Sequence, residues 1–450
     1  MSYFKKVKQT TTNISNKFPI YARIARGGVW KIGGTALVSI LSVLISALLA
    51  RLLSPSDMGD YTYALSLVVM VSTVAGVGLG PTAIREVAVS LGLGDKDKTR
   101  DLLQQIIKWG FISLTVTILI FYLIRDNLGI QSGIVPLIIA WILLLSPQQL
   151  WIDLVRSFRN TQVASLFHGG RIGGPIAASV SAIILYIVWK TQGQIQLKTA
   201  ILILLVGGGI SLVLLAIILN RNIRLNIGGL KLSFDLPALA LLGASLPVLF
   251  HSLGSSLQTQ SSIWILKAFQ PETDIALMGV AFQLASFLMI QQNIVIFVLS
   301  PEIAALFSEG KIIKLEKLQR RIAAVAFLPT LIGFLIYLFW GSEILRILYG
   351  PFYISAKPIL MIITVGYLFH VFAGACGLIL TMSGNQLELM KISLICSVIT
   401  AGAGLLLVQS FGVLGVATAA SLGYIVKNIW MLLRVRKLVG IWTFASLKWK

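Results

Sequence analysis

The chain is 450 residues long, 57% of its residues are hydrophobic and only 12% are charged. A soluble domain carries about 25% charged residues, so this composition excludes an ordinary soluble protein and indicates a membrane protein. The net charge of +21 would suggest a nucleic-acid partner in a soluble protein, but here the basic residues stand in short loops beside apolar stretches, where they orient the chain and attract anionic membrane lipids.

Twelve apolar stretches, each about long enough to cross a bilayer, follow one another along the chain. A hydrocarbon core about 30 Å thick needs roughly 20 mainly apolar residues in each helix. This pattern predicts an all-α integral membrane protein with twelve transmembrane helices. The stretches lie at 29–52, 60–80, 103–124, 133–152, 173–189, 199–219, 237–264, 275–299, 322–340, 356–382, 390–409 and 412–433.

The basic residues in the loops predict which side of the membrane each loop faces. When the loops are assigned alternately to the two sides, 30 of the 37 Lys and Arg residues fall on one side, Lys427 near the C-terminus among them. Cytoplasmic loops carry the excess of basic residues, so we expect both termini in the cytoplasm. The residues assigned to the other side are Arg51, Arg125, Lys190, Lys198, Lys267, Arg346 and Lys357.

A polar segment separates the first six spans from the last six. The expected parts are a basic cytoplasmic segment at 1–28, an N-terminal lobe at 29–220, a linker at 221–236, a C-terminal lobe at 237–437 and a cytoplasmic tail at 438–450.

The two halves share a local pattern. Arg51 precedes Pro55 by four residues after the first span, and Lys267 precedes Pro271 by four residues after the seventh. The match predicts two six-helix lobes related by a pseudo-twofold axis along the membrane normal, with a substrate site between them. Chance agreement is the alternative.

Polar side chains form stripes inside several spans. A polar group in a span is costly and faces either a cavity or another helix. The stripes therefore predict a hydrated space between the first, seventh, eighth and tenth spans, with interhelical hydrogen bonds as the alternative. They comprise Ser39, Ser42 and Ser46; His251, Ser255, Gln258 and Ser262; Gln283, Ser286 and Asn293; and His370, Gly374, Gly377 and Thr381.

Five basic residues at or just inside the span ends are candidates for binding an anionic head group. The planar fork of Arg suits phosphate especially well. Long cationic side chains at span ends also reach toward the interface without any ligand, and Arg85 has Glu86 beside it as a local partner. The five are Lys31, Arg51, Arg85, Arg171 and Lys267.

Several motifs are missing from the sequence. No Asp or Glu stands near the middle of a span, whereas a proton- or Na⁺-coupled cation exporter would be expected to place a carboxylate there. The chain has no HExxH, no GxxxxGK(S/T) and no clustered His, Cys and Asp residues, so we expect no catalytic residue, no metal site and no cofactor. Cys376 and Cys396 both lie in spans and suggest no disulfide.

The stretch ARLLSPSDMGDYTYALSLVVMVSTVAGVGLGPTAIREVA (50–88) resembles the opening signature of the bacterial polysaccharide or O-antigen flippase family. The stretches at 344–360, 382–392 and 409–424 are similar to the last three spans of that family. The residues that occupy the signature positions are Arg51, Gly59, Tyr61, Gly78, Leu79, Gly80 and Arg85.

The resemblance implies two six-helix lobes with alternating access to a central cationic cavity. The implied substrate is a polyprenyl-diphosphate-linked oligosaccharide, which would cross from the cytoplasmic to the outer leaflet of the inner membrane during polysaccharide or O-antigen synthesis. A glycan polymerase and other polysaccharide-assembly proteins are conceivable partners. The same superfamily includes multidrug and toxin extrusion antiporters, so multidrug or cation antiport is the alternative function. A membrane-embedded enzyme would be expected to present a sizeable outer loop, which this chain lacks.

Overall fold

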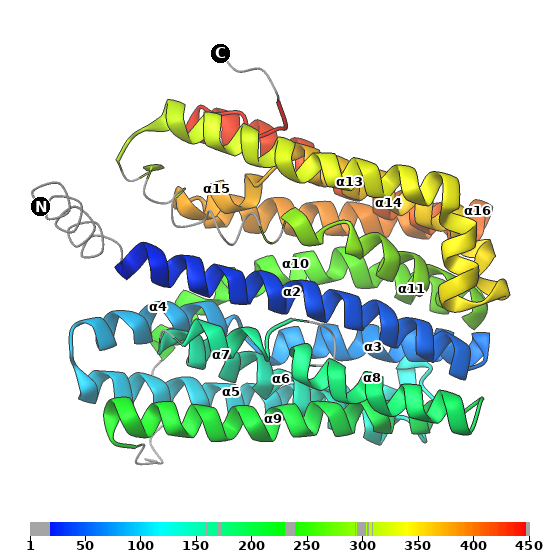
Figure 1. Ribbon diagram of the computed structural model, residues 1–450, viewed down its shortest axis with the longest axis horizontal. Helices are drawn as coiled ribbons and strands as arrows, with labels where there is room; N and C mark the ends of the chain where they lie inside the picture. Colours follow the sequence, from blue (N-terminus) through cyan, green and yellow to red (C-terminus); the bar gives the residue numbers. More distant parts are fainter. Residues whose placement is uncertain are drawn as a thin grey trace, which may run out of the picture.

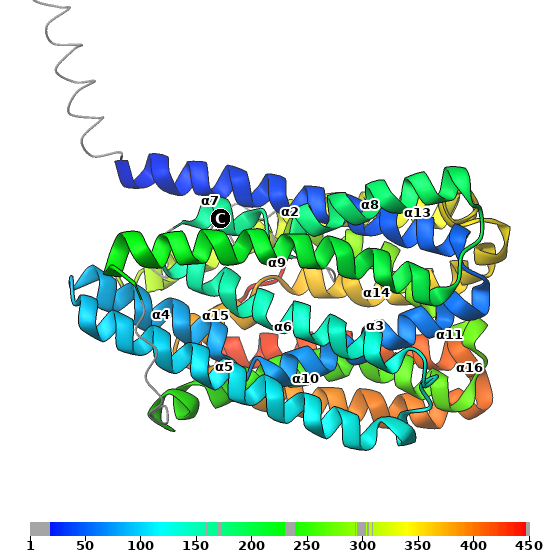
Figure 2. The same cartoon turned by 90° about the horizontal axis from the view of Figure 1, so that it is seen from below.

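The computed structural model describes residues 19–158, 160–169, 173–229, 239–292, 294, 303, 306–307 and 309–446, with the side chains of the first helix described from residue 33 onward. In these ranges the chain forms helices and no strand. Most helices run along the longest axis of the molecule (Figures 1 and 2). The first half contains α2 (Pro19–Leu52), α3 (Pro55–Ala75), α4 (Leu79–Gly92), α5 (Lys96–Ile124), η1 (Arg125–Leu128), α6 (Val135–Ser157), α7 (Thr161–Ser165), α8 (Gly174–Thr191) and α9 (Leu197–Ile227).

The second half repeats the pattern of long helices. Nine helical segments of the described chain are long and apolar enough to cross a membrane, and α16 alone is 54 residues long. Its backbone departs from helical geometry at Gly412, where the predicted span 412–433 begins. The elements are α10 (Leu239–Phe269), α11 (Glu272–Phe287), α13 (Ile312–Tyr349), η2 (Pro351–Ala356), α14 (Lys357–Ala373), α15 (Cys376–Met382) and α16 (Gln386–Val439).

The predicted span 356–382 is not one helix. It breaks at Gly374, whose φ of 78° is a left-handed value that favours glycine, and α14 and α15 lie on either side. The C-terminal segment packs at this break, where the hydroxyl of Thr443 donates to the carbonyl of Ala373 at 2.8 Å. The predicted stripe from His370 to Thr381 is therefore wrong as a single helix face.

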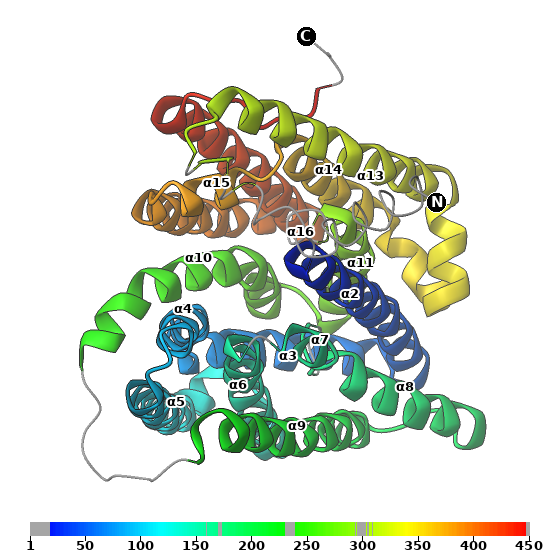
Figure 3. The same cartoon turned by 60° about the vertical axis from the view of Figure 1, so that its left-hand side comes forward.

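The helices form two groups (Figure 3). α3 to α9 lie in one group, and α11 and α13 to α16 lie in the other. α2 packs most heavily on α8 and belongs to the first group, and α10 packs most heavily on α16 and belongs to the second, and both run along the boundary between the groups. α3 packs against both α10 and α11, and α10 packs along α16. The groups therefore meet chiefly through α2, α3, α10 and α11.

The two groups share a large buried apolar core at one end, and α10 also contacts the first group at the other end, where Ser245 Oγ donates to Thr82 Oγ1 at 3.1 Å. The largest core draws on both groups and includes Leu49 of α2, Ile275 of α11 and Leu360 of α14. A second core lies in the first group, with Leu241 of α10 added to it, and a third belongs to the second group alone. The shared core lies toward the right-hand end of Figure 1, where α2 leads into α3. At the opposite end each group has its own core.

Candidate functional site

A lysine lies inside the second group of helices. Lys427, on the second half of α16, is only 8% exposed. Its ammonium donates to Gln258 Oε1 at 3.1 Å and to Ser255 Oγ at 3.5 Å. Both partners are on α10 and stand about one helical turn apart, so Lys427 bridges α16 and α10.

Lys427 is the one charged residue among the buried side chains of the described ranges. The other buried polar residues are Ser, Thr, Gln and Asn, and no Asp or Glu that the structure describes is buried. The ion pairs found in these ranges do not include Lys427. A buried charge without a counter-charge is costly, and an ionisable residue within a membrane protein commonly marks a substrate or ion pathway.

Two histidines extend the polar network around this lysine. His251 Nδ1 lies 3.0 Å from Ser393 Oγ, which again joins α10 to α16. His370 Nδ1 lies 2.9 Å from Oδ1 of Asn428, the neighbour of Lys427. The Asn428 amide donates its own N–H to the carbonyl of Tyr424, so His370 donates to Asn428 and not the reverse.

The same region contains polar groups that lack a partner. Gln258 Nε2 and Ser261 Oγ are both buried on α10 without a hydrogen bond to any described residue. Gln258 already accepts from Lys427 through its oxygen, so its free group is a donor. An ammonium with an unpaired amide donor beside it is chemically suited to an anionic or hydroxyl-rich ligand. We name Lys427, Ser255, Gln258, His251 and His370 the lysine site.

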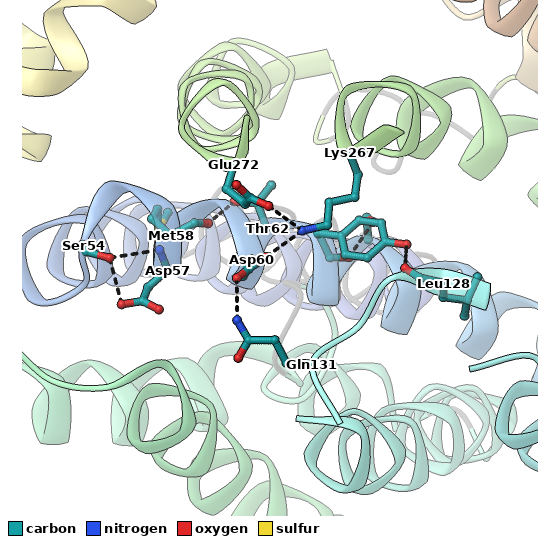
Figure 4. A network of polar contacts seen from close by, with 11 residues as sticks. Ser54, Asp57, Met58, Asp60, Thr62, Leu128, Gln131, Lys267 and Glu272 are labelled. Carbon is teal, nitrogen blue, oxygen red and sulfur yellow. Dashed lines mark hydrogen bonds and ion pairs between the residues drawn. The ribbon is translucent and has the colours of Figure 1, made fainter. Parts of the chain in front are cut away.

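A second polar cluster joins the two groups of helices where α3 and α11 begin (Figure 4). The ammonium of Lys267, near the end of α10, lies 3.0 Å from Asp60 Oδ1 of α3 and 3.0 Å from Glu272 Oε1 of α11. Asp60 also accepts from Gln131 Nε2 at 3.2 Å. The hydrogen bond from Lys267 lowers the pKa of Glu272. One lysine thus pairs with carboxylates from both groups.

Arg51 crosses between the groups in the opposite direction. It stands in the last turn of α2, and its Nε donates to the carbonyl of Leu348 at 2.9 Å. Its second guanidinium nitrogen donates to the carbonyl of Ile347. Carbonyls in the last turn of a helix lack intrahelical partners and carry partial negative charge, so the end of α13 is a good acceptor for a cation. Trp189 of α8 lies beneath the guanidinium, 5.8 Å from ring centre to Cζ.

Backbones approach closely beside these contacts. A Cβ atom added to Gly59 of α3 would lie 2.0 Å from the carbonyl oxygen of Glu272. One added to Gly279 of α11 would lie 2.6 Å from Cγ2 of Thr62. Only glycine fits at Gly59, because the atom that a side chain would meet belongs to the main chain. We name this contact between α3 and α11 the seam.

The structure brings some of the predicted site residues together and separates others. His251, Gln258 and His370 belong to the lysine site. Gln283 is buried instead at a small pocket between α2, α3 and α11, which Ser42 and Ser46 also line. The predicted polar stripes of the first and eighth spans therefore meet, whereas the stripe on α10 contacts α16.

The five basic candidates do not form one cluster. Arg51 and Lys267 make the contacts between the groups described above. Arg85 has a side chain 63% exposed and pairs with Glu86 at 3.0 Å, as the sequence alternative allowed. Lys31 lies on α2, but its side chain is outside the described residues, and so are Arg171 and Asn293.

Sequence reasoning missed Lys427. The charge pattern places it with the basic residues of the cytoplasmic loops, whereas the structure buries its side chain against α10. A signal was present: Lys427 and Asn428 stand within the apolar stretch 412–433, where a cation is unusual. Removing one residue from a count of 30 against 7 leaves the charge asymmetry almost unchanged.

The chain is similar to proteins of known family and to solved structures. The model of a family described as "Polysaccharide biosynthesis protein" matches residues 24–307. CapF, a capsular polysaccharide biosynthesis protein of Staphylococcus aureus, is 23% identical over 407 residues, which cover 87% of this chain and 94% of CapF.

Two solved structures illustrate the shared fold. A multidrug resistance MATE family transporter of the MOP superfamily, in an inward-facing conformation, matches with a TM-score of 0.70 and 14% identity over 92% of this chain and 98% of its own. A MOP superfamily transporter from Pyrococcus furiosus matches with a TM-score of 0.66 and 14% identity over 93% of this chain and 95% of its own. At this identity the likeness concerns the fold.

Proposed function

The chain belongs to the polysaccharide biosynthesis protein family, and from this premise we propose that it is a multi-pass membrane transporter. It carries a polyprenyl-diphosphate-linked oligosaccharide from the cytoplasmic to the outer leaflet of the cytoplasmic membrane. Such a head group cannot cross hydrocarbon unaided, because its charges and hydroxyls would leave water without replacement partners. A transporter with two groups of helices solves this by alternating access, in which the groups rock about a fixed site.

The lysine site is the observation that most favours this substrate. The one buried charge in the described interior is positive, and neutral donors and acceptors surround it. A cation antiporter of the same fold needs the opposite arrangement, a buried carboxylate that attracts its substrate. A positive interior repels a cationic drug and attracts a diphosphate, while Gln, Ser and His side chains replace water around sugar hydroxyls.

We propose the following division of roles. Lys427 contributes the cation that holds the diphosphate, with Gln258, His251 and His370 as its polar neighbours. Gln283 contacts the head group at the pocket between α2, α3 and α11. Lys31, Arg85 and Arg171 stay candidates from the sequence for drawing the anionic head group in from the cytoplasm, and Asn293 for solvating its sugars.

For the membrane topology we propose twelve crossings in two lobes, 29–220 and 237–437, related by a pseudo-twofold axis. The nine long apolar segments support nine crossings, and the non-helical Gly412 within α16 supports a tenth. α10 and α11 supply the remaining two. The similar starts of α3 and α11 support the relation between lobes, since Pro55 begins α3 and Pro271 precedes α11, and acidic residues stand in both first turns.

Cysteine labelling will test the proposed orientation. With Cys376 and Cys396 replaced by alanine, a cysteine at Gln192, an exposed residue after α8, is expected to react with a membrane-impermeant maleimide in intact cells. A cysteine at Lys96, exposed at the start of α5, is expected to react only after permeabilisation. The reverse pattern would place both termini outside and overturn the orientation.

The transport proposal is tested with the purified protein in liposomes that contain a polyprenyl diphosphate bearing a short oligosaccharide. About half of the glycan lies in the outer leaflet from the start and is accessible to an added glycosidase. We expect the glycosidase to reach more than this half only in liposomes that contain the protein. The matched measurement is efflux of a quaternary ammonium dye under a proton or Na⁺ gradient, which should be absent. Dye efflux without glycan transfer would contradict the proposal and support the cation antiporter.

A further inference from the structure

Arg51 and Lys267 occupy equivalent places in the two halves and reach across the molecule in opposite directions. Arg51 stands in the last turn of α2, four residues before Pro55, and donates to the end of α13 in the second group. Lys267 stands near the end of α10, four residues before Pro271, and holds Asp60 of α3 in the first group. A long cationic side chain that only extends to the membrane–water interface would not be expected to contact the opposite group of helices. Arg51 and Lys267 both contact it.

Both contacts lie at the end of the molecule where the groups share one apolar core. The seam between Gly59 and Glu272 is immediately beside the Lys267 cluster, and Asp60 follows Gly59 in α3. On the orientation proposed above, this end faces away from the cytoplasm. Lys267 and Asp60 are 19% and 16% exposed, so water screens their attraction less than it would screen a surface pair.

We propose that Arg51 and Lys267 are reciprocal clasps that hold the outer end of the transporter closed, and that both must release before the cargo can leave on the outer side. The assignment of this end as the outer one rests on the proposed function and topology. In this state Lys267 is paired with Asp60 and Glu272, and Arg51 donates to the carbonyls of α13. We therefore assign these two side chains to closure of the outer end, and not to the contact with the head group that the sequence predicts for them.

The two clasps are chemically different. Lys267 is held by two carboxylates, so its contact depends on charge and weakens with salt and with protonation of its partners. Arg51 is held by main-chain carbonyls, whose partial charge no side-chain substitution removes. Closure therefore relies on one contact that substitution of its acidic partners removes and one that no side-chain substitution in α13 removes.

The clasp is tested by how readily a half-buried cysteine reacts from outside. Ser46 lines the pocket between α2, α3 and α11, and a cysteine there, in a background without Cys376 and Cys396, reports opening of the outer end. We expect Lys267→Gln and Arg51→Gln each to make this cysteine react about tenfold faster with an impermeant thiol reagent in intact cells. A tenfold change corresponds to a loss of about 1.4 kcal/mol in the stability of the closed state relative to the open state. The matched control is Arg346→Gln, since Arg346 pairs with Glu343 within α13 and both are half exposed.

A charge exchange separates a clasp from a ligand. Asp60→Lys combined with Lys267→Glu leaves one cation facing two carboxylates but moves the cation to the other group. We expect slow reaction at the reporter to return in this variant, which also shows that the exchanged protein folds. Unchanged reaction in both single variants, or failure of the exchange to restore slow reaction, would overturn the clasp. Because the reporter needs no cargo, faster reaction in the single variants together with an absence of glycan transfer by the unsubstituted protein would contradict the proposed function and leave the clasp standing.

Discussion

Replacing Lys427 by methionine is expected to abolish transport of the lipid-linked oligosaccharide while the protein stays folded in the membrane. Methionine has similar length and apolar character, and removing a buried charge that lacks a carboxylate partner spares the cost of desolvating it. Stability should therefore be unchanged or higher. The cargo loses a desolvated charge contact, which costs about 2–5 kcal/mol, or roughly 30- to several thousand-fold in transport.

The Lys427 variant needs a control that removes a lysine elsewhere on the same helix. Lys391→Met serves this purpose, because Lys391 is on α16 but its side chain is 61% exposed and pairs with Glu388. Glycan transfer in liposomes and the thermal unfolding midpoint are measured for both variants. Normal transfer with Lys427→Met would show that the lysine site does not hold the cargo, and a sharp fall in the midpoint would show that the lysine is structural.

Gly59→Ala is expected to prevent closure of the outer end and thereby to stop transport. The added methyl group would lie 2.0 Å from the carbonyl oxygen of Glu272, and main-chain atoms can move away only if α3 and α11 separate. Overpacking of this kind typically costs about 1–3 kcal/mol. That cost falls only on the state in which the seam is closed, so the equilibrium shifts toward the open outer end.

The seam prediction is checked with the reporter at Ser46 and with glycan transfer. Gly209→Ala is the matched control, because Gly209 is a helical glycine of α9 with no atom within 4 Å of an added Cβ. That change should leave both readouts unaffected and stabilise the helix by up to about 1 kcal/mol. If Gly59→Ala leaves the reaction at the reporter slow and glycan transfer normal, the seam does not take part in closing the outer end.

The sequence was sufficient for the membrane class and the family, because both depend on local signals. Apolar stretches of bilayer length and the signature around Arg51, Gly59 and Arg85 are visible without a structure, and the family match confirms their interpretation. The face shared by His251, Ser255 and Gln258 also follows from helical spacing, and all three contact α16 as a set.

The lysine contact, the Arg51 contact and the helix break depend on which helices pack together. The spacing of residues within one helix does not give that information. The contact between Lys427 and Gln258 joins residues 169 positions apart, and it requires α10 to lie along α16 in one rotation. The contact of Arg51 with the end of α13 uses main-chain acceptors, which no side-chain pattern reveals. The break at Gly374 arises from packing of the segment around Thr443, which lies far along the chain.

The core that both groups share at one end has a consequence for the energised membrane. A potential of 100 mV across the bilayer acts on each elementary charge with about 2.3 kcal/mol, so any continuous aqueous path through the protein would drain it. Leu49, Ile275 and Leu360 are among the apolar side chains packed across that end, and an ion that entered their packing would lose its water without gaining polar partners. The same packing that joins the two groups therefore also opposes the passage of ions, which limits discharge of the cell while the outer end is closed.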